Sequence, residues 1–188
     1  MNARYILSCL AGIGILGFNT GCGDSIQRGA ESPQDDAPVV QITPAPEGVD
    51  RAFFGDYFVN AQNEQVDAEA LSGKRIGLYF SAIWCPPCRD FTPRLVDAYN
   101  TMRQQGQPFE VVFVSSDRNN EAMFQYMNEY DMAWLSVPFD DERRMAMAQH
   151  HQIRGIPSLV VVDERGQVIS RQGVRDIRAH GANAIQHW

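Results

Sequence analysis

SAIWCPPCRD (residues 81–90) is the most informative stretch of this sequence, because it holds two cysteines, Cys85 and Cys88, separated by two prolines. A near-continuous apolar run at 75–82 precedes the pair and predicts a strand that is buried on both faces. Apolar residues then recur at helical spacing, which predicts a helix over 86–104. The cysteines therefore fall where a buried strand passes into a helix.

This position favours redox chemistry. Cys85 is expected near the helix N-cap and Cys88 in the first turn, where residues three apart lie about 5–6 Å from each other and can form a disulfide. The unpaired N–H groups and positive end of a helix lower cysteine pKa values to roughly 3.5–7.5. Because the thiolate is the nucleophile, Cys85 is predicted to attack and Cys88 to resolve the mixed disulfide. Pro86 and Pro87 suit the first turn and stiffen it, but they remove N–H donors.

Other interpretations of the cysteine pair are weaker. A structural zinc site usually takes four ligands, and the nearest candidates, His150 and His151, lie at a predicted helix end without a partner motif. A purely structural disulfide would add little stability, because the loop that it closes is so short. We therefore expect a redox-active disulfide with no metal and no separate cofactor.

Composition excludes one class of function. The chain has 188 residues, 44% of them hydrophobic, which is enough for a sizeable core. The 16 basic residues are outnumbered by 23 acidic ones, giving a net charge of −7. Binding to nucleic acid requires clustered basic residues that neutralise phosphates, so no nucleic-acid partner is expected.

The N-terminus has the pattern of a signal peptide. An apolar run of h-region length, too short to span a membrane, follows MNAR, and NTGC then ends in Cys22. This ending resembles the lipobox of bacterial lipoproteins, although Asn19 replaces the usual aliphatic residue. The resemblance implies a signal peptide at 1–21, lipidation of Cys22 and a location on the periplasmic side of a bacterial membrane. Simple secretion and an uncleaved anchor are the alternatives.

The rest of the chain divides into a linker and one domain. Residues 22–48 are rich in Pro, Asp, Gln and Gly, which is typical of a flexible tether or a disordered N-terminus. Residues 49–188 are expected to fold as an α/β sheet with an antiparallel edge. The further predicted elements are a strand at 108–116, helices at 119–130 and 140–151, a hairpin at 158–170 and a short helix within 174–188.

Several single residues carry expectations of their own. Helix 140–151 is predicted to have acids in its first turn. Asp117 follows a strand end and either serves the site or caps the next helix. Trp134 is expected to pack under a loop or to line the substrate cleft. Core positions are predicted at Met123, Phe124, Met127, Met145, Ala146 and Ala148.

Longer blocks of sequence resemble one known family. GKRIGLYFSAIWCPPCRDFTPRLVDAY, FEVVFVSSDRN, AWLSVPFDD and GIPSLVVVD follow one another across most of residues 71–163. In order and spacing they resemble the tryparedoxin and nucleoredoxin branch of the thioredoxin superfamily. The resemblance implies a thioredoxin fold, with a central mixed sheet flanked by helices and the CxxC motif at a helix N-terminus.

The resemblance also implies roles for residues around the cysteines. Trp84 belongs to the docking surface, together with the loop residues Pro86 and Pro87. The Ile156–Pro157 bond is implied to be cis and to lie against the disulfide, where substrate backbone can pair with it; composition and spacing alone would not select this minority state.

Two further residues are marked by comparison with ordinary thioredoxins. Pro93 is where thioredoxin helices kink. Tyr79 stands six residues before the first cysteine, where ordinary thioredoxins have a buried acid, so it is a candidate for proton handling. Water or a different acid are the alternatives for that role, and Tyr79 is equally interpretable as a core residue beneath the loop.

The sequence thus predicts an exported, lipid-anchored thiol–disulfide oxidoreductase that reduces protein substrates. A membrane electron donor or acceptor is then an expected partner. A dedicated reductant of apocytochrome c is one alternative, and a non-catalytic binding module with a structural disulfide is another.

Overall fold

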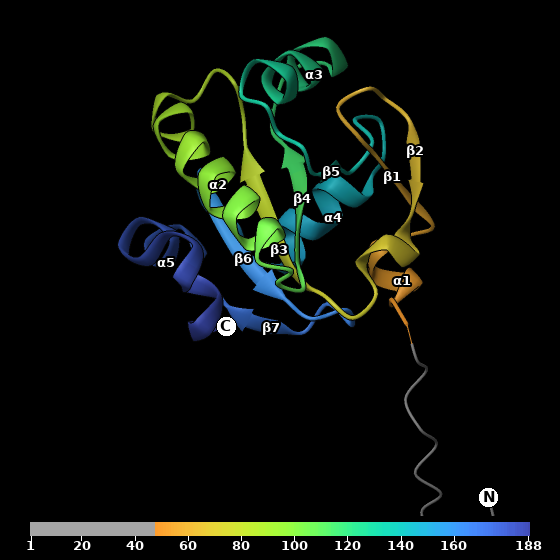
Figure 1. The fold of residues 1–188 in the computed structure, drawn as a ribbon. Coiled ribbons are helices and arrows are strands. Elements are labelled where there is room, and N and C mark those ends of the chain that lie inside the picture. The colour runs from red at the N-terminus through yellow and green to blue at the C-terminus, as the bar shows by residue number, and fades with distance from the viewer. Residues whose placement is uncertain (1–47) are drawn as a thin grey trace, which may run out of the picture. The chain divides into compact units, whose positions relative to one another are not determined.

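The structure is a computed structural model that describes residues 48–188 (Figure 1). The predicted signal peptide at 1–21, the lipidation site Cys22 and all but the last residue of the linker at 22–48 lie outside the described residues. Within the described part, no helix is both long enough and apolar enough to cross a membrane.

One mixed sheet of seven strands, in the order β2-β1-β5-β4-β3-β6-β7, forms the centre of the domain. β3 pairs with β4 in parallel and with β6 antiparallel, and β4 pairs with β5 in parallel. The predicted mixed sheet with an antiparallel edge is therefore confirmed. The strands are β1 (Tyr57–Val59), β2 (Gln65–Asp67), β3 (Arg75–Ser81), β4 (Phe109–Ser115), β5 (Leu135–Ser136), β6 (Ser158–Val162) and β7 (Val168–Ser170).

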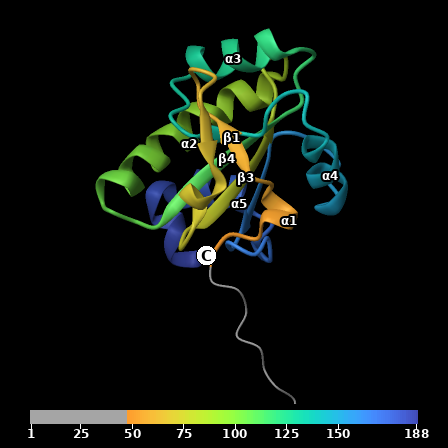
Figure 2. The ribbon, with the colours of Figure 1, turned by 90° about the vertical axis from the view of Figure 1, so that its right-hand side faces the viewer.

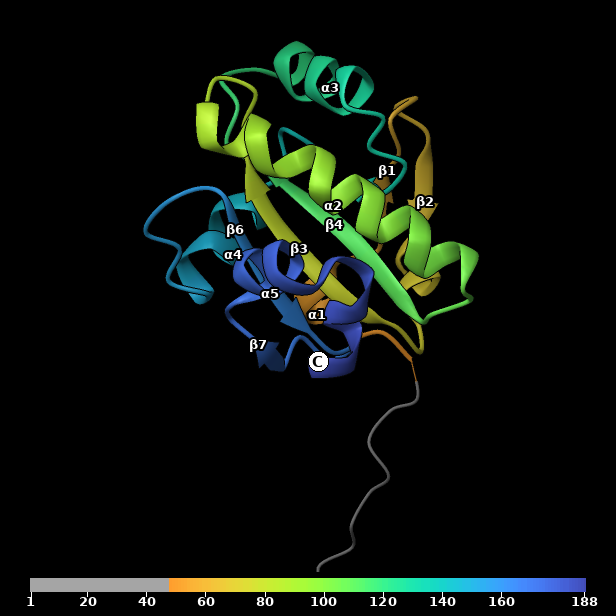
Figure 3. The same cartoon turned by 60° about the vertical axis from the view of Figure 1, so that its left-hand side comes forward.

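Helices cover both faces of this sheet (Figure 2). Successive side chains of β3 point to opposite faces, so Tyr79 enters one core while Leu78 and Phe80 enter the other. α2, α3, α5 and η2 pack on the Tyr79 face, and Figure 3 shows α2 and α5 across it. α1, η1 and α4 pack on the opposite face. The helices are α1 (Arg51–Phe54), η1 (Ala68–Leu71), α2 (Pro86–Gln104), α3 (Asn120–Glu129), α4 (Arg143–His150), α5 (Gly173–His180) and η2 (Gly181–His187), the two η elements being 3₁₀ helices.

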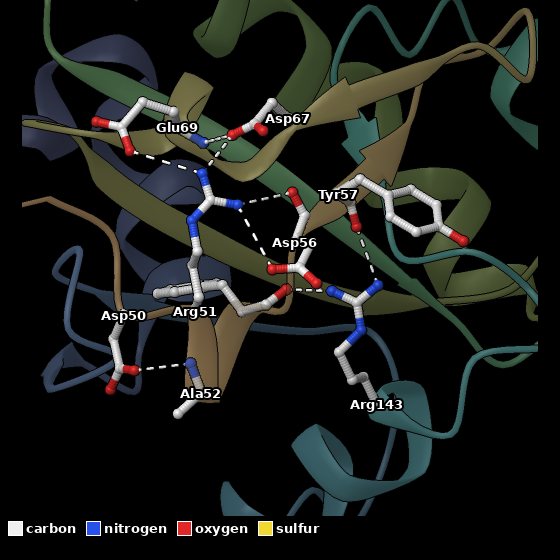
Figure 4. Close-up of polar contacts among 9 residues, drawn as sticks. Asp50, Arg51, Ala52, Asp56, Tyr57, Asp67, Glu69 and Arg143 are labelled. Atoms are coloured by element: carbon white, nitrogen blue, oxygen red, sulfur yellow. Dashed lines mark hydrogen bonds and ion pairs between the residues drawn. The ribbon is translucent and has the colours of Figure 1, made fainter.

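Two arginines tie the first elements of the domain together (Figure 4). The Arg51 guanidinium lies 2.7 Å from the carboxylate of Asp67 and also donates to the carbonyl of Asp56, which joins α1 to the β1–β2 hairpin. Arg143 at the start of α4 donates to the carbonyls of Phe54 and Tyr57. These contacts fix the hairpin edge of the sheet against α4.

The α4 segment differs from its prediction. The helix begins at Arg143, and Asp140 and Asp141 precede it, so the expectation of acids in its first turn is wrong. The carboxylate of Asp141 accepts the Arg143 N–H at 2.8 Å and so ends the preceding turn. With the helix in this register, Met147 is buried while Met145 is 64% exposed.

The core predictions are confirmed in part. Met123 and Met127 are buried, and Phe124 packs partly buried against them. Ala148 packs partly buried against the core on the other face of the sheet, whereas Ala146 is exposed, so that prediction fails together with Met145. Trp134 is buried in the core on the Tyr79 face of the sheet, 5.5 Å from the ring of Tyr99.

Candidate active site

The cysteine pair lies where β3 ends and α2 begins. Cys85 is the N-cap of α2 and Cys88 is in its first turn, as predicted, and the two form a disulfide with 5.2 Å between their Cα atoms. Pro86 and Pro87 carry no N–H, and the N–H groups of Cys88 and Arg89 both donate to the Cys85 carbonyl at 3.0 and 3.1 Å. The helix start therefore aims no unpaired N–H at the sulfurs from these four positions.

The two sulfurs differ in access. Cys85 is 4% exposed and Cys88 is completely buried. Ala82 and the half-buried Ile156 pack beside them. An incoming sulfur can therefore reach Cys85 but not Cys88.

A loop between α4 and β6 lies against the disulfide. The Ile156–Pro157 bond is cis, which confirms the expectation drawn from the family resemblance. The carbonyl oxygen of Ile156 lies 3.7 Å from the Cys85 sulfur. Backbone polar groups of this loop are thus next to the reacting sulfur, where an extended peptide can pair with them.

The segment after β4 holds the loop that leads to Cys85. Asp117 is buried, and its carboxylate accepts the Ile83 N–H at 2.8 Å and the Ser115 hydroxyl at 2.7 Å. Burial raises the pKa of this carboxyl. Trp84 donates its indole N–H to the Ser116 carbonyl at 3.1 Å yet remains 51% exposed.

Asp117 therefore serves the site and does not cap α3. The cap of that helix is Asn119, whose side chain accepts the Ala122 N–H at 2.8 Å. Sequence reasoning missed Arg144, whose guanidinium donates to the Ser115 carbonyl at 2.6 Å and lies 4.1 Å from the ring of Phe139. No motif in the sequence signals this contact.

Behind the disulfide, four buried hydroxyls form a closed ring. Thr92 donates to the carbonyl of Cys88 at 2.9 Å, so its single proton is used. Tyr79 and Tyr126 must then donate to Thr92, at 2.7 and 2.6 Å, while Ser81 donates to Tyr79 at 3.0 Å. The four hydroxyl protons are then all assigned, and the fifth contact, between Ser81 and Tyr126 at 3.2 Å, closes the ring without a proton of its own. Sequence reasoning singled out Tyr79 but missed its three partners.

This ring fixes what Tyr79 can contribute. Burial strongly raises the pKa of its phenol, which therefore stays protonated and cannot act as a base in its resting state. Its proton is committed to Thr92, and Thr92 contacts the backbone of Cys88. Tyr79 is thus linked to the backbone of Cys88 through Thr92.

His150 and His151 were the nearest candidate metal ligands in the sequence. His151 is 2% exposed, and neither of its ring nitrogens has a hydrogen-bond partner among the described residues. Burial, reinforced by the neighbouring His150 and Arg171, lowers the pKa of His151 to about 4. Within residues 48–188, no three His, Cys, Asp or Glu side chains gather as a metal site would need.

Comparison with known proteins places these features in a family. Residues 73–168 match the family described as thioredoxin-like. Probable nucleoredoxin 1 of Arabidopsis thaliana is 46% identical over 130 residues, which cover 69% of this chain and 22% of that protein. Nucleoredoxin of Danio rerio is 40% identical over 147 residues, covering 78% of this chain and 32% of that protein. The chain thus spans between about a fifth and a third of the length of these relatives.

Solved structures match over a larger share of their length. Tryparedoxin II from C. fasciculata superimposes with a TM-score of 0.64 at 31% identity, covering 71% of this chain and 88% of that chain. Tryparedoxin I from Crithidia fasciculata gives a TM-score of 0.64 at 30% identity, covering 70% of this chain and 92% of that chain. The thioredoxin fold predicted from the sequence is confirmed.

Proposed function

Because the chain belongs to the thioredoxin-like family, we propose that it is a thiol–disulfide oxidoreductase that reduces protein disulfides through Cys85 and Cys88. The observation that carries the proposal is the unequal access of the two cysteines, 4% exposed against completely buried, at the start of α2. One cysteine can meet a substrate and the other can meet only its partner, which is the arrangement that a two-step exchange needs.

The exchange proceeds in two balanced steps. In the reduced protein, the Cys85 thiolate attacks one sulfur of the substrate disulfide, forming a mixed disulfide and releasing the other substrate sulfur as a thiolate. The Cys88 thiolate then attacks the Cys85 sulfur and releases the second substrate thiolate. Two electrons pass to the substrate, whose thiolates take protons from water, and the Cys85–Cys88 disulfide remains.

Docking uses the surface around Cys85. The exposed Trp84 indole and the Pro86–Pro87 turn form one side, and the Ile156–Pro157 loop forms the other. A substrate strand that pairs with the backbone of Ile156 carries its sulfur towards Cys85, because that carbonyl already lies 3.7 Å from the Cys85 sulfur.

Tyr79 has an indirect part in proton handling. The proton of the Cys88 thiol leaves to water, since the Tyr79 phenol is already protonated and donates to Thr92. The hydroxyl ring holds the Cys88 carbonyl through Thr92 and so positions the resolving sulfur. Tyr79 is a positioning residue in this scheme.

The cellular setting that we propose rests on the sequence alone. Cleavage after residue 21 and lipidation of Cys22 anchor the protein on the periplasmic side of a bacterial membrane. A membrane dithiol protein then returns the Cys85–Cys88 disulfide to the reduced form. Mass analysis of the N-terminal peptide tests the anchor: a diacylglyceryl adduct on Cys22, lost in Cys22→Ser, supports it, and an unmodified Cys22 refutes it.

Two cysteine variants test the exchange itself. Cys85→Ser should abolish reduction of a disulfide substrate, and Cys88→Ser should accumulate mixed disulfides that survive denaturing gels without reductant. Ala146→Ser, at an exposed position of α4, is the control and should retain the activity. Full activity of Cys85→Ser refutes the proposal. If the Cys85–Cys88 disulfide resists mild reductant while the protein still captures a partner, the result favours a non-catalytic binding module.

The mixed disulfides also separate two substrate classes. Partners trapped by Cys88→Ser that carry CxxCH motifs would assign the protein to reduction of apocytochrome c. Partners with unrelated cysteine contexts would assign it to general reduction of protein disulfides.

A further inference from the structure

Three arginines on three separate segments lie within two residues, in sequence, of residues that form or contact the disulfide or hold the loop before it. Arg89 directly follows Cys88 in α2, and Arg118 directly follows Asp117, the residue that holds the loop before Cys85. Arg154 lies two residues before Ile156, whose carbonyl approaches the Cys85 sulfur to 3.7 Å. All three side chains are exposed.

None of these arginines is neutralised by the described part of the chain. No carboxylate of residues 48–188 lies within 4.0 Å of their guanidinium groups, and these groups donate no hydrogen bond to those residues. The nearest acids in sequence are occupied elsewhere. Asp90 lies 3.6 Å from Arg178, and Asp117 is buried against backbone and hydroxyl donors.

Arg89 lies where a positive charge does not stabilise the fold. It lies close to the N-terminus of α2, where the helix dipole disfavours a positive charge, and that helix has no acid in its first turn. The chain as a whole carries a net charge of −7. Three positive charges thus lie on the segments next to the cysteine pair of an acidic protein.

We propose that these three arginines, the arginine collar, select protein substrates whose cysteines are flanked by Asp or Glu residues. This inference rests on the proposed exchange function and specifies its substrate class. Guanidinium groups bind carboxylates with paired hydrogen bonds, and the collar residues come from α2, from the segment after β4 and from the loop before β6. The exposed Trp84 supplies apolar contact between the charges.

The expected effect is moderate because the arginines are exposed. Solvent-exposed ion pairs are individually weak, so three pairs together should give about a tenfold preference. The preference should fall towards unity near 1 M salt, where the screening length is only about 3 Å.

The test compares matched disulfide peptides in single-turnover reactions with the reduced full-length chain. The peptides share one sequence and differ only in carrying Asp, Ser or Lys on both sides of the disulfide. The readout is the ratio of second-order rate constants for the Asp and Ser peptides. Within one protein variant this ratio cancels any change in the intrinsic reactivity of Cys85, which matters because Arg89 lies beside the cysteines.

We expect a ratio of about ten for the unmodified chain, with the Lys peptide slower than the Ser peptide. The ratio should fall to near one in the triple variant Arg89→Gln, Arg118→Gln, Arg154→Gln. Arg165→Gln, in the turn between β6 and β7 at the opposite end of the sheet, should keep it near ten.

The outcomes separate the two proposals. Equal rates for all three peptides overturn the arginine collar while the exchange function stands. A ratio that survives the triple variant also overturns it. Failure to reduce any of the peptides overturns the exchange function and the collar together.

Discussion

Replacing Thr92 by Val removes one buried hydroxyl and leaves the shape of the side chain almost unchanged. Thr92 is completely buried and connects Tyr79, Tyr126 and the carbonyl of Cys88. In Thr92→Val the two phenols lose their acceptor. Ser81 can accept from Tyr126 at 3.2 Å, but it donates to Tyr79, so the Tyr79 phenol is left without an acceptor.

The magnitude follows from the number of donors left without a partner. A buried donor that loses its acceptor costs about 1–3 kcal/mol. Tyr79 without an acceptor and Tyr126 with only a longer contact to Ser81 should together lower the free energy of unfolding by about 2–4 kcal/mol. With a urea m value of about 2 kcal/mol/M, the unfolding midpoint falls by about 1–2 M.

The assay is urea unfolding of the oxidised full-length chain, followed by tryptophan fluorescence. Thr92→Ser is the matched control because it keeps the hydroxyl and loses only a methyl group, with an expected cost of about 1 kcal/mol. A Thr92→Val variant at least as stable as Thr92→Ser would refute the donor count on which the hydroxyl ring rests.

Three further predictions concern the surroundings of the site. Trp84→Ala should slow reduction of a protein substrate by about 10- to 100-fold, because tryptophans that a bound partner covers contribute much of the binding energy of an interface. Reduction of a small aromatic disulfide should change less than about threefold. Asp117→Ala leaves the Ile83 N–H and a serine hydroxyl without their acceptor, so it should destabilise the fold by about 1–3 kcal/mol, and Asp117→Asn, which keeps one acceptor oxygen, by less. The pKa of His151 is about 4 in the folded state against roughly 6.5 when unfolded, so the unfolded chain binds more protons between these values and stability should fall as pH drops from about 6.5 to 4.

Each of these predictions has its own control. Met145→Ala removes an exposed apolar side chain on α4 and should leave reduction of protein substrates unchanged. If Trp84→Ala slows protein and small substrates equally, the docking role is wrong. His151→Leu should flatten the acid dependence measured by unfolding, and His180→Asn, on an exposed histidine, should not. An unchanged acid slope in His151→Leu would assign the effect to other groups.

Local pattern predicted the elements on which the cysteines stand. The helix predicted at 86–104 is α2 with the same bounds, because the CPPC motif marks its start and its apolar spacing is regular. The strands predicted at 75–82 and 108–116 are β3 and β4 to within one residue at each end. β5, with only two residues, and the short β1–β2 hairpin offered too little periodicity to be detected.

Features that depend on tertiary contacts were not accessible in this way. The hydroxyl ring joins β3, α2 and α3, and no local pattern connects Tyr79 with Tyr126. Contacts of Asp141 and Arg143 set the register of α4. Sequence periodicity does not reveal these contacts, so it wrongly predicted Met145 as a core residue. The cis bond before Pro157 was expected from family resemblance, since X–Pro bonds are cis in only about 5–6% of cases.

The measurement that tests the central claim most directly is the reduction potential of the Cys85–Cys88 pair. The full-length chain carrying Cys9→Ser and Cys22→Ser, in which this pair is the only one left, would be equilibrated in thiol–disulfide buffers and its free thiols counted by alkylation. Each 30 mV corresponds to about 1.4 kcal/mol, so the method separates the roles well. A potential near or below roughly −250 mV is predicted for a reductant, and a potential above roughly −150 mV would contradict that role and assign the protein to disulfide formation.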